Sequence, residues 1–314
     1  MKPVLFHIGE LTIHSYFFFL TLGFVVATII GIMEFKRANL SVKTFIDLAI
    51  VIVIFGMIGS RVMHIVAEDI PHDVYCSQRL DRCGPDPEKL KKEGGDDVVK
   101  EFNRGEKIIK FYIAHPSRMF NVFKGGLAYY GGFIFGTIAA IIFMRRKKMN
   151  MLFTSDTIGY GTAIGLFFGR LGCFLNGCCF GHQTDSFLGV HFPKGSAAFA
   201  ELANAGIVKA GRDSETPALL PTQLFESIFS LLLFLYLYLY LRRHKEYDGQ
   251  IIVHFVSIYA IFRFIIEFFR SDNRGIFFGL LSSSQIISII LLAGSLLLWQ
   301  SLRKKGEENV SKTV

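Results

Sequence analysis

Two arginines lie in stretches of this sequence that are otherwise almost entirely apolar. Arg170 stands in GRLGCFLNG, residues 169–177, at the end of an apolar run, and Arg263 stands within Gln250–Phe269. A charged side chain inside a membrane costs roughly 2.5–3.5 kcal/mol on insertion scales, so we interpret both arginines as candidate functional residues. A guanidinium group can hold two phosphate oxygens with parallel hydrogen bonds. The arginines therefore predict a binding site for the phosphate of a lipid headgroup.

Tyr259, Arg263 and Glu267 are spaced four residues apart, so on a helix they share one face. One interpretation is that an Arg263–Glu267 pair only fixes this helix in the bundle. The other is that Glu267 positions Arg263 as a second cation for the phosphate held by Arg170. We favour the second, because intramembrane charges generally face a cavity or a partner. Tyr259 and Glu267 are therefore expected among the substrate-binding residues.

A glycine-rich segment, KGGLAYYGG at residues 124–132, leads into another apolar stretch. Its glycines permit close helix packing or close approach of a ligand, and its tyrosines belong to an interfacial aromatic belt or reach a cavity. We place Tyr130 in the cavity, as a hydrogen-bond donor or proton-transfer group, and Tyr129 in the belt. Arg61 either extends to the membrane interface or contacts lipid. The further substrate contacts that we expect are Arg61, Tyr16, Asn176, Gly125, Gly126, Gly131 and Gly132.

Membrane-spanning helices must position these residues. The chain has 314 residues, of which 51% are hydrophobic, and a mean hydropathy of +0.42. A helix needs about 20 apolar residues to cross a bilayer. We therefore expect an all-α polytopic membrane protein with seven transmembrane helices. The seven stretches are Ser15–Met33, Phe45–Ile65, Gly125–Met144, Leu152–Phe168, Thr222–Leu241, Gln250–Phe269 and Gly275–Leu302.

Basic residues gather after the first, third, fifth and seventh of these stretches. Because cytoplasmic loops carry the excess of Lys and Arg, we expect the N-terminus outside and the C-terminus in the cytoplasm, in a bacterial inner membrane. The net charge of +8 follows largely from this bias and needs no nucleic-acid partner. We expect a single membrane-embedded domain, 1–314, with an extracytoplasmic insertion at 68–118 and an extracytoplasmic loop at 180–220.

Two local features concern helix starts. The N-terminal stretch lacks the basic region and small-residue cleavage site of a signal peptide, so we expect it to remain as the first span. Asp156 lies near the beginning of the fourth stretch, behind Thr154 and Ser155. We expect Asp156 to cap the N-terminus of its own helix.

The five cysteines fall into two groups. Cys76 and Cys83 lie in the predicted extracytoplasmic insertion, where we expect a disulfide. The other three, Cys173, Cys178 and Cys179, are the cysteine cluster. Three interpretations of this cluster are open: packing at a tight turn, which we favour, a disulfide, or a metal site. No metal is expected, because no clear set of histidine or carboxylate ligands accompanies the thiols.

The motif around Arg170, extended to Gly181, resembles the signature of the prolipoprotein diacylglyceryl transferase family. Four other stretches match that family in order and spacing, and together the motifs span about residues 10 to 300. The four are Lys124–Gly132, Pro221–Glu226, Tyr259–Arg270 and Ser282–Ile286. The seven-span topology with the N-terminus outside is also similar to that of the family.

The resemblance implies an enzyme that transfers the diacylglyceryl group from phosphatidylglycerol to the lipobox cysteine thiol of a prolipoprotein. Its partners would be phosphatidylglycerol, membrane lipid and prolipoprotein signal peptides bearing that cysteine; no cofactor is expected. Arg170, Arg263 and Tyr130 would be the catalytic residues. The family has His or Tyr at the position of Tyr130. With an ordinary pKa near 10, Tyr130 is a poor base, so it would orient the lipid unless neighbouring cations activate it.

The sequence departs from the family pattern at three positions. Cys173 stands where the family usually has Asn, Cys178 where it has Glu, and Leu220 where it often has His. The phosphate-binding arginines are retained, whereas polar groups around them are lost. Two other classes of protein are therefore alternatives: a non-catalytic lipid-binding or lipid-moving membrane protein, and a membrane thiol-redox protein built on the cysteine cluster.

Overall fold

The structure is a computed structural model that describes residues 4–8, 11–64, 129–209, 211–271, 276–277 and 281–311. The predicted insertion at 68–118, the pair Cys76 and Cys83, and the glycines Gly125 and Gly126 lie outside these residues. The chain divides into two compact units. One is formed by Lys43–Met149, and the other by Met1–Val42 with Asn150–Val314.

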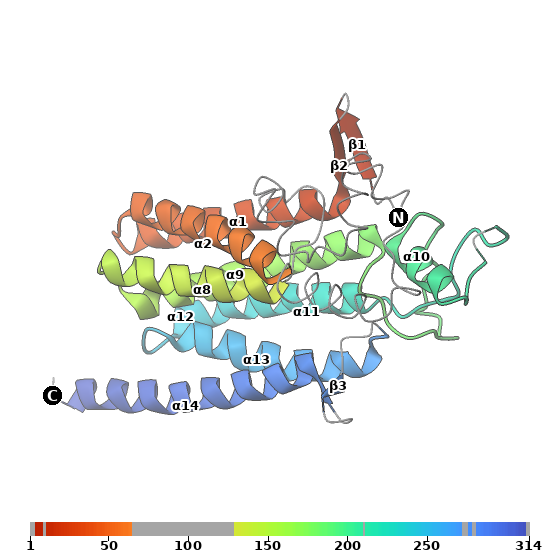
Figure 1. Ribbon diagram of the computed structural model, residues 1–314. Helices are drawn as coiled ribbons and strands as arrows, with labels where there is room; N and C mark the ends of the chain where they lie inside the picture. The colour runs from red at the N-terminus through yellow and green to blue at the C-terminus, as the bar shows by residue number, and fades with distance from the viewer. Residues whose placement is uncertain are drawn as a thin grey trace, which may run out of the picture. The chain divides into compact units, whose positions relative to one another are not determined.

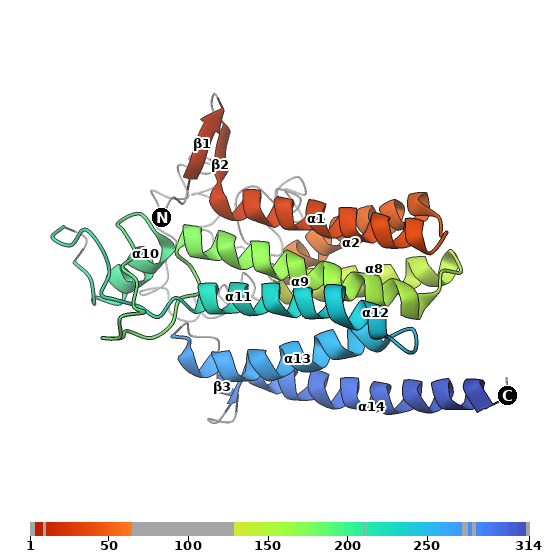
Figure 2. The same ribbon diagram turned by 180° about the vertical axis from the view of Figure 1, so that it is seen from behind.

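The second of these units is a helical bundle that carries both candidate arginines (Figure 1). Its central helix, α9 (Met151–Asn176), packs against α1 (Ser15–Arg37), α11 (Thr222–Leu235) and α13 (Gln250–Ile266). Helix α14 (Ser283–Ser311) packs along α13, as Figure 2 also shows from behind. The π-helical turn η3 (Tyr236–Leu241) and α12 (Arg242–His244) continue α11, and the 3-10 turn η4 (Glu267–Phe269) continues α13.

Helix α9 begins and ends with clear capping residues. The Asn150 side chain accepts a hydrogen bond from the Phe153 amide at 3.1 Å, and Gly177 ends the helix in the left-handed region with φ of 74°. Small residues bring α9 close to α1: a β-carbon at Gly172 would lie 3.2 Å from the Cα of Tyr16. Such close contacts stabilise helix pairs in membranes, where no hydrophobic effect drives association.

The prediction that Asp156 caps its own helix is wrong. Asn150 holds that position, and Asp156 is buried in the second turn of α9. Its carboxylate instead accepts hydrogen bonds from the amides of Gly249 and Ile252, at 2.9 and 3.0 Å, and so caps the N-terminus of α13. Lys245, 3.2 Å away, pairs with it. Burial disfavours the charge of Lys245, but hydrogen bonding to Asp248 and the charge of Asp156 outweigh this and raise its pKa.

Helix α14 begins later than the predicted stretch Gly275–Leu302. Residues Ile276–Phe277 (β3) and Leu281–Ser282 (β4) form a short antiparallel pair, as do Val4–Ile8 (β1) and Leu11–His14 (β2) at the other end of the chain. The start of α14 is then fixed by a capping box. The Ser282 hydroxyl accepts from the Gln285 amide at 3.2 Å, and the Gln285 side chain accepts from the Ser282 amide at 3.0 Å.

The predicted loop 180–220 is a packed segment rather than an open connection. It contains α10 (Ala197–Asn204), which the Ser196 side chain caps, and several isolated β-bridges, one of them between Gln183 and Leu219. A small apolar core holds it together and consists of Phe180, Phe192, Ala198 and Leu219.

The smaller unit contains α2 (Val42–His64) and α8 (Tyr129–Arg146). Glycines pack these two helices: Gly131 meets the Gly59 carbonyl, and a β-carbon at Gly132 would lie 3.1 Å from the Gly56 carbonyl oxygen. Gly131 and Gly132 thus serve close helix contact, one of the two alternatives drawn from the sequence.

Among the described residues, six helices are long and apolar enough to cross a membrane. They are Ser15–Arg37, Val42–Met63, Met151–Asn176, Thr222–His244, Gln250–Phe269 and Ser283–Lys304. They confirm a multi-pass helical membrane protein and correspond to six of the seven predicted stretches. The remaining one, Gly125–Met144, begins outside the described residues and overlaps α8.

Candidate active site

A single buried carboxylate gathers three arginines at the end of the larger unit where α9 ends and α11 begins. Glu226, in the second turn of α11, lies 2.8 Å from Arg170 of α9, 2.7 Å from Arg270 and 3.7 Å from Arg263 of α13. Arg270 donates a hydrogen bond to Glu226 Oε1, whereas the Arg170 contact to Oε2 is a close ion pair without hydrogen-bond alignment. Glu226 thus links residues from three separate parts of the chain.

A second carboxylate holds Arg263 in place. Glu267, one turn later, lies 2.7 Å from Arg263 Nη2, and the Ser284 hydroxyl accepts from the same nitrogen at 3.2 Å. Ser282, the capping residue of α14, donates its hydroxyl to Glu267 at 2.8 Å. The predicted Arg263–Glu267 pair is therefore confirmed, and α14 supports it. The action of this pair on substrate stays a prediction.

We call the three arginines together with Glu226 and Glu267 the arginine cluster. Its net charge is positive, so a bound anion would balance it. Arg170, Arg263 and Arg270 carry three positive charges, and Glu226 and Glu267 carry two negative charges, so the net charge is +1. Within the described part of the chain, Arg263 Nη1 makes no hydrogen bond and lies 3.7 Å from the nearest Glu226 oxygen. A buried donor without a partner is costly, and a bound anion would satisfy it.

The three arginines differ in exposure, and this separates their roles. The side chain of Arg270 is 1% exposed and that of Glu226 is 2% exposed, so this pair is inaccessible to a ligand. The side chains of Arg170 and Arg263 are 16% and 10% exposed. Arg170 and Arg263 are therefore the more accessible arginines of the three.

The beginning of α11 is attached to the end of α9 through two side chains. Thr222 donates to the Cys179 carbonyl at 2.8 Å, and Gln223 donates to the Cys178 carbonyl at 2.7 Å. Glu226 follows one turn after Gln223 on the same helix. The Pro-Thr-Gln motif therefore fixes the distance between Glu226 and Arg170, because it connects the two helices that carry them.

The cysteine cluster lies beside the arginine cluster. Its three sulfur atoms lie within 4.8 Å of one another, and all three thiols are free. Hydrogen bonds from the Cys173 and Cys178 thiols, and then the charges of Arg170 and Arg270, lower the pKa of Cys179. The carboxylate partner of Arg170 is Glu226.

Three further predicted residues lie near the two clusters. Tyr259 interacts electrostatically with Arg170 and stacks on Phe255. Asn176 is the last residue of α9 and lies beside the Cys178 thiol. Tyr16, in the first turn of α1, interacts with Arg170 and with the cysteine cluster. Their contact with substrate stays a prediction.

The other predicted site residues belong to the smaller unit. Arg61 is on α2, while Tyr130, Gly131 and Gly132 are on α8. The structure gives the backbone of Tyr130 in the first turn of α8 and does not describe its side chain. The participation of these residues in a common site with Arg170 stays a prediction.

Sequence reasoning missed Glu226 and Arg270 as site residues. A signal for Glu226 was present, since it is the one carboxylate in the fifth apolar stretch and an intramembrane carboxylate needs a partner. Arg270 follows the sixth stretch and therefore looked like an interfacial residue. It is buried because the chain turns back at this point and Arg270 forms a β-bridge with Gly181.

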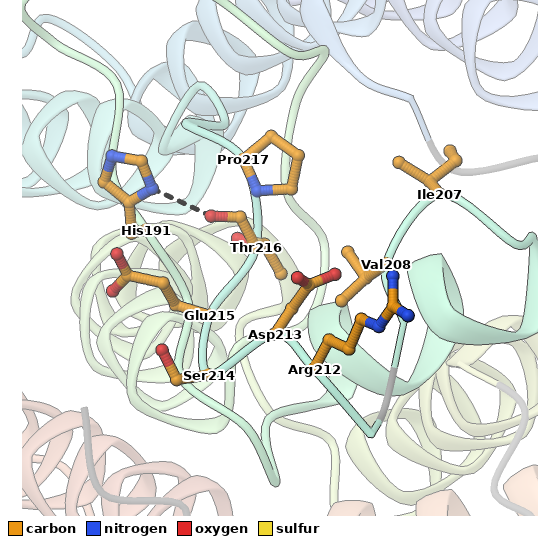
Figure 3. Close-up of a pocket in the computed structure, with 9 residues that line it drawn as sticks. All are labelled: His191, Ile207, Val208, Arg212, Asp213, Ser214, Glu215, Thr216 and Pro217. Carbon is orange, nitrogen blue, oxygen red and sulfur yellow. Dashed lines mark hydrogen bonds between the residues drawn. The ribbon is translucent and has the colours of Figure 1, made fainter.

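A separate pocket of about 430 Å³ lies in the segment around α10, away from the arginine cluster (Figure 3). His191, whose Nδ1 lies 2.8 Å from the Thr216 carbonyl, is at one side, and Arg212 and Asp213 are at the other. None of the arginines that contact Glu226 lines this pocket.

The fold and the site define a multi-pass membrane protein with a buried, net positive cluster suited to a phosphate ester. A family model for prolipoprotein diacylglyceryl transferase matches residues 3–83 and 102–300. The chain therefore belongs to the prolipoprotein diacylglyceryl transferase family, which confirms the resemblance drawn from the motifs.

Relatives of nearly the same length are found in clostridia. The chain is 31% identical to phosphatidylglycerol–prolipoprotein diacylglyceryl transferase 2 of Clostridium perfringens, over 99% of this chain and 100% of the relative. It is 27% identical to phosphatidylglycerol–prolipoprotein diacylglyceryl transferase of Clostridioides difficile, over the same shares. The enzyme of that name from Clostridium tetani is 29% identical over 93% of this chain and 94% of the relative.

Proposed function

We propose that this protein transfers the diacylglyceryl group of phosphatidylglycerol to the lipobox cysteine thiol of prolipoproteins, the first step of bacterial lipoprotein maturation. The observation that carries the proposal is the cluster of three arginines on Glu226, with its net charge of +1. A phosphodiester carries one negative charge, which balances that cluster. The names of the clostridial relatives include the same donor and acceptor.

The reaction exchanges one bond at the glycerol carbon that carries the phosphate. The thiol sulfur forms a C–S bond to this carbon, the C–O bond to phosphate breaks, and glycerol phosphate leaves with the bonding electron pair. The thiol proton passes to the departing phosphate or to a base. Negative charge grows on the phosphate as the C–O bond breaks, so fixed cations stabilise the transition state more than the ground state.

Arg170 and Arg263 perform this stabilisation, because their side chains are the accessible ones. Arg263 Nη1 is buried and makes no hydrogen bond within the described residues, so a phosphate oxygen that enters the cluster would satisfy it, while Nη2 is held by Glu267 and Ser284. Arg170 is held from one side by Glu226. Arg270 and Glu226 act as positioning residues, since both are buried against each other.

The proposed enzyme crosses the inner membrane seven times, with its N-terminus outside and its C-terminus in the cytoplasm. Helix α8 is then the third span. The first turn of α8, which carries Tyr130, and the end of α2, near which Arg61 lies, are then the extracytoplasmic ends of their helices. Supporting this arrangement, the basic residues Arg145 and Arg146 end α8 at its opposite terminus.

The test uses the purified protein, phosphatidylglycerol in detergent micelles and a synthetic lipobox peptide. Mass spectrometry is expected to show the peptide with one added diacylglyceryl group. Arg170→Ala and Arg263→Ala are each expected to lower kcat/KM by roughly 10²–10³-fold, as for the loss of one charge-stabilising group in a dry site. Arg→Lys is expected to restore only part of this, since an ammonium group lacks the planar fork.

The matched control is Arg243→Ala, which removes an equal charge from an exposed position at the other end of the bundle and should leave the rate unchanged. Binding of phosphatidylglycerol without any peptide adduct would overturn the proposal and identify a non-catalytic lipid-binding protein. Near wild-type rates for both alanine variants would overturn the assigned role of the arginines.

A further inference from the structure

The three thiols of the cysteine cluster face one another although they come from different backbone environments. Cys173 is in the last turn of α9, and Cys178 and Cys179 follow the helix end at Gly177. Their sulfur atoms lie within 4.8 Å of one another, and no other histidine, cysteine or carboxylate among the described residues joins the group. Cys173 is buried, and Cys178 and Cys179 are partly buried.

The backbone adopts an unfavourable conformation that brings Cys179 into this cluster. Cys179 has φ of 64°, in the left-handed region that costs a residue with a β-carbon about 1–2 kcal/mol. Its carbonyl is held there by Thr222, and the carbonyl of Cys178 by Gln223. Backbone strain of this kind persists where surrounding contacts enforce it, and it concentrates at functional sites.

The spacing of the sulfurs suits a metal ion. Zinc lies about 2.3 Å from a thiolate sulfur, so three thiolates around one ion lie about 3.8–4.0 Å apart. This is within the 4.8 Å limit of the cluster, so small side-chain rotations suffice. A disulfide would use only two of the sulfurs, at about 2.05 Å, and would leave the third thiol without a role.

We propose that Cys173, Cys178 and Cys179 form a trigonal thiolate site for a thiophilic ion, Cu(I) or Zn(II). Sequence reasoning did not expect a metal because histidine and carboxylate ligands were missing. Soft thiolates alone are sufficient for these ions. On binding, each thiol releases its proton to solvent, and no electron transfer takes place. The fourth coordination position stays open to solvent or to a ligand.

The arginine cluster compensates the charge of such a site. Three thiolates with Zn(II) carry a net charge of −1, and with Cu(I) a net charge of −2. Arg170 precedes Cys173 by one helical turn and interacts electrostatically with Cys173 and Cys179, and Arg270 also interacts with Cys179. The positive charges of Arg170 and Arg270 beside the sulfur atoms therefore favour the charged, metal-bound form. The site goes beyond the proposed transferase reaction, which needs no metal.

The test measures metal binding by the full-length, reduced protein in which Cys76→Ser and Cys83→Ser remove the two other thiols. Zn(II) and Cu(I) are each titrated against a chromophoric chelator. We expect one ion per chain and X-ray absorption that gives three sulfur neighbours at about 2.2–2.3 Å. Replacing Cys173 or Cys178 by Ser is expected to weaken binding at least 100-fold.

The Cys179→Gly variant tests whether a loss of ion binding comes from the missing thiol or from a disturbed fold. Glycine accepts φ of 64° without strain, so this variant should melt at the same or a higher temperature than its parent while it loses the ion. Added ion should raise the melting temperature of the parent and leave that of Cys179→Gly unchanged. Equal affinity of parent and variants would overturn the proposal. So would a disulfide between two of the three thiols in protein alkylated at the moment of cell lysis.

Discussion

Glu226→Gln removes the charge that holds the arginine cluster together while keeping the size of the side chain. The carboxylate lies 2.8 Å from Arg170 and 2.7 Å from Arg270. A glutamine can keep its oxygen toward Arg270, which is the aligned hydrogen bond. Its amide nitrogen then points at Arg170, so that two donors face each other. We therefore expect Arg170 to leave its position while Arg270 remains.

The size of the effect follows from one lost ion pair. Two unit charges about 4 Å apart attract by about 4 kcal/mol at an effective dielectric constant of 20. Arg170 is partly accessible, and solvent screening reduces this, so we expect about 2 kcal/mol, or roughly a 30-fold fall in kcat/KM. Glu226→Ala leaves all three arginines without this partner. Loss of one member of a buried pair costs about 3–5 kcal/mol, so this variant should also unfold more readily.

The assay is the rate of diacylglyceryl transfer to a lipobox peptide at varied phosphatidylglycerol, with thermal unfolding in detergent measured in parallel. The control is Glu246→Gln, an exposed carboxylate in the connection before α13, which should change neither quantity. If Glu226→Gln stays folded and its kcat/KM remains within about threefold of wild type, then Glu226 does not position Arg170 and our account of the cluster is wrong.

Four further outcomes are expected. Tyr130→Phe slows transfer and Tyr130→His retains it, whereas Tyr129→Phe has little effect. A peptide assay in which Tyr129→Phe slows transfer more than Tyr130→Phe would show that the assigned face of α8 is reversed. Asp156→Ala lowers the free energy of unfolding by about 1–2 kcal/mol without changing transfer, because it removes the cap of α13; unchanged thermal unfolding would contradict this. Ser282→Ala weakens both the capping box and the support of the arginine pair, so kcat/KM should fall by roughly 5–10-fold for about 1 kcal/mol; an unaltered rate would exclude this support. Replacing all three residues of the cysteine cluster by Ser leaves most transfer activity in metal-free buffer, whereas complete loss in a folded protein would indicate a covalent role in catalysis.

The sequence determined the class of this protein. The length and composition of its apolar stretches predict membrane spans. A run of about 20 apolar residues is a local property, so it can be recognised in the sequence alone. The same argument identified Arg170, Arg263 and Glu267, because a charge in such a run requires a functional or structural partner. The Arg263–Glu267 pair was predictable, since both residues belong to one helix and a spacing of four fixes their contact.

Only the tertiary structure decided which groups complete the site. Glu226 meets Arg170 and Arg270 from 56 and 44 positions away in the chain, and helix packing rather than local spacing sets these contacts. The same holds for Asp156, which lies near the start of α9 yet caps α13, because the nearest unpaired amides belong to the neighbouring helix. The convergence of three thiols depends on the backbone angle of Cys179, which Thr222 and Gln223 enforce from another helix. The sequence specifies such contacts only through the packing of all the helices, because the position of each helix in the fold determines which side chains meet.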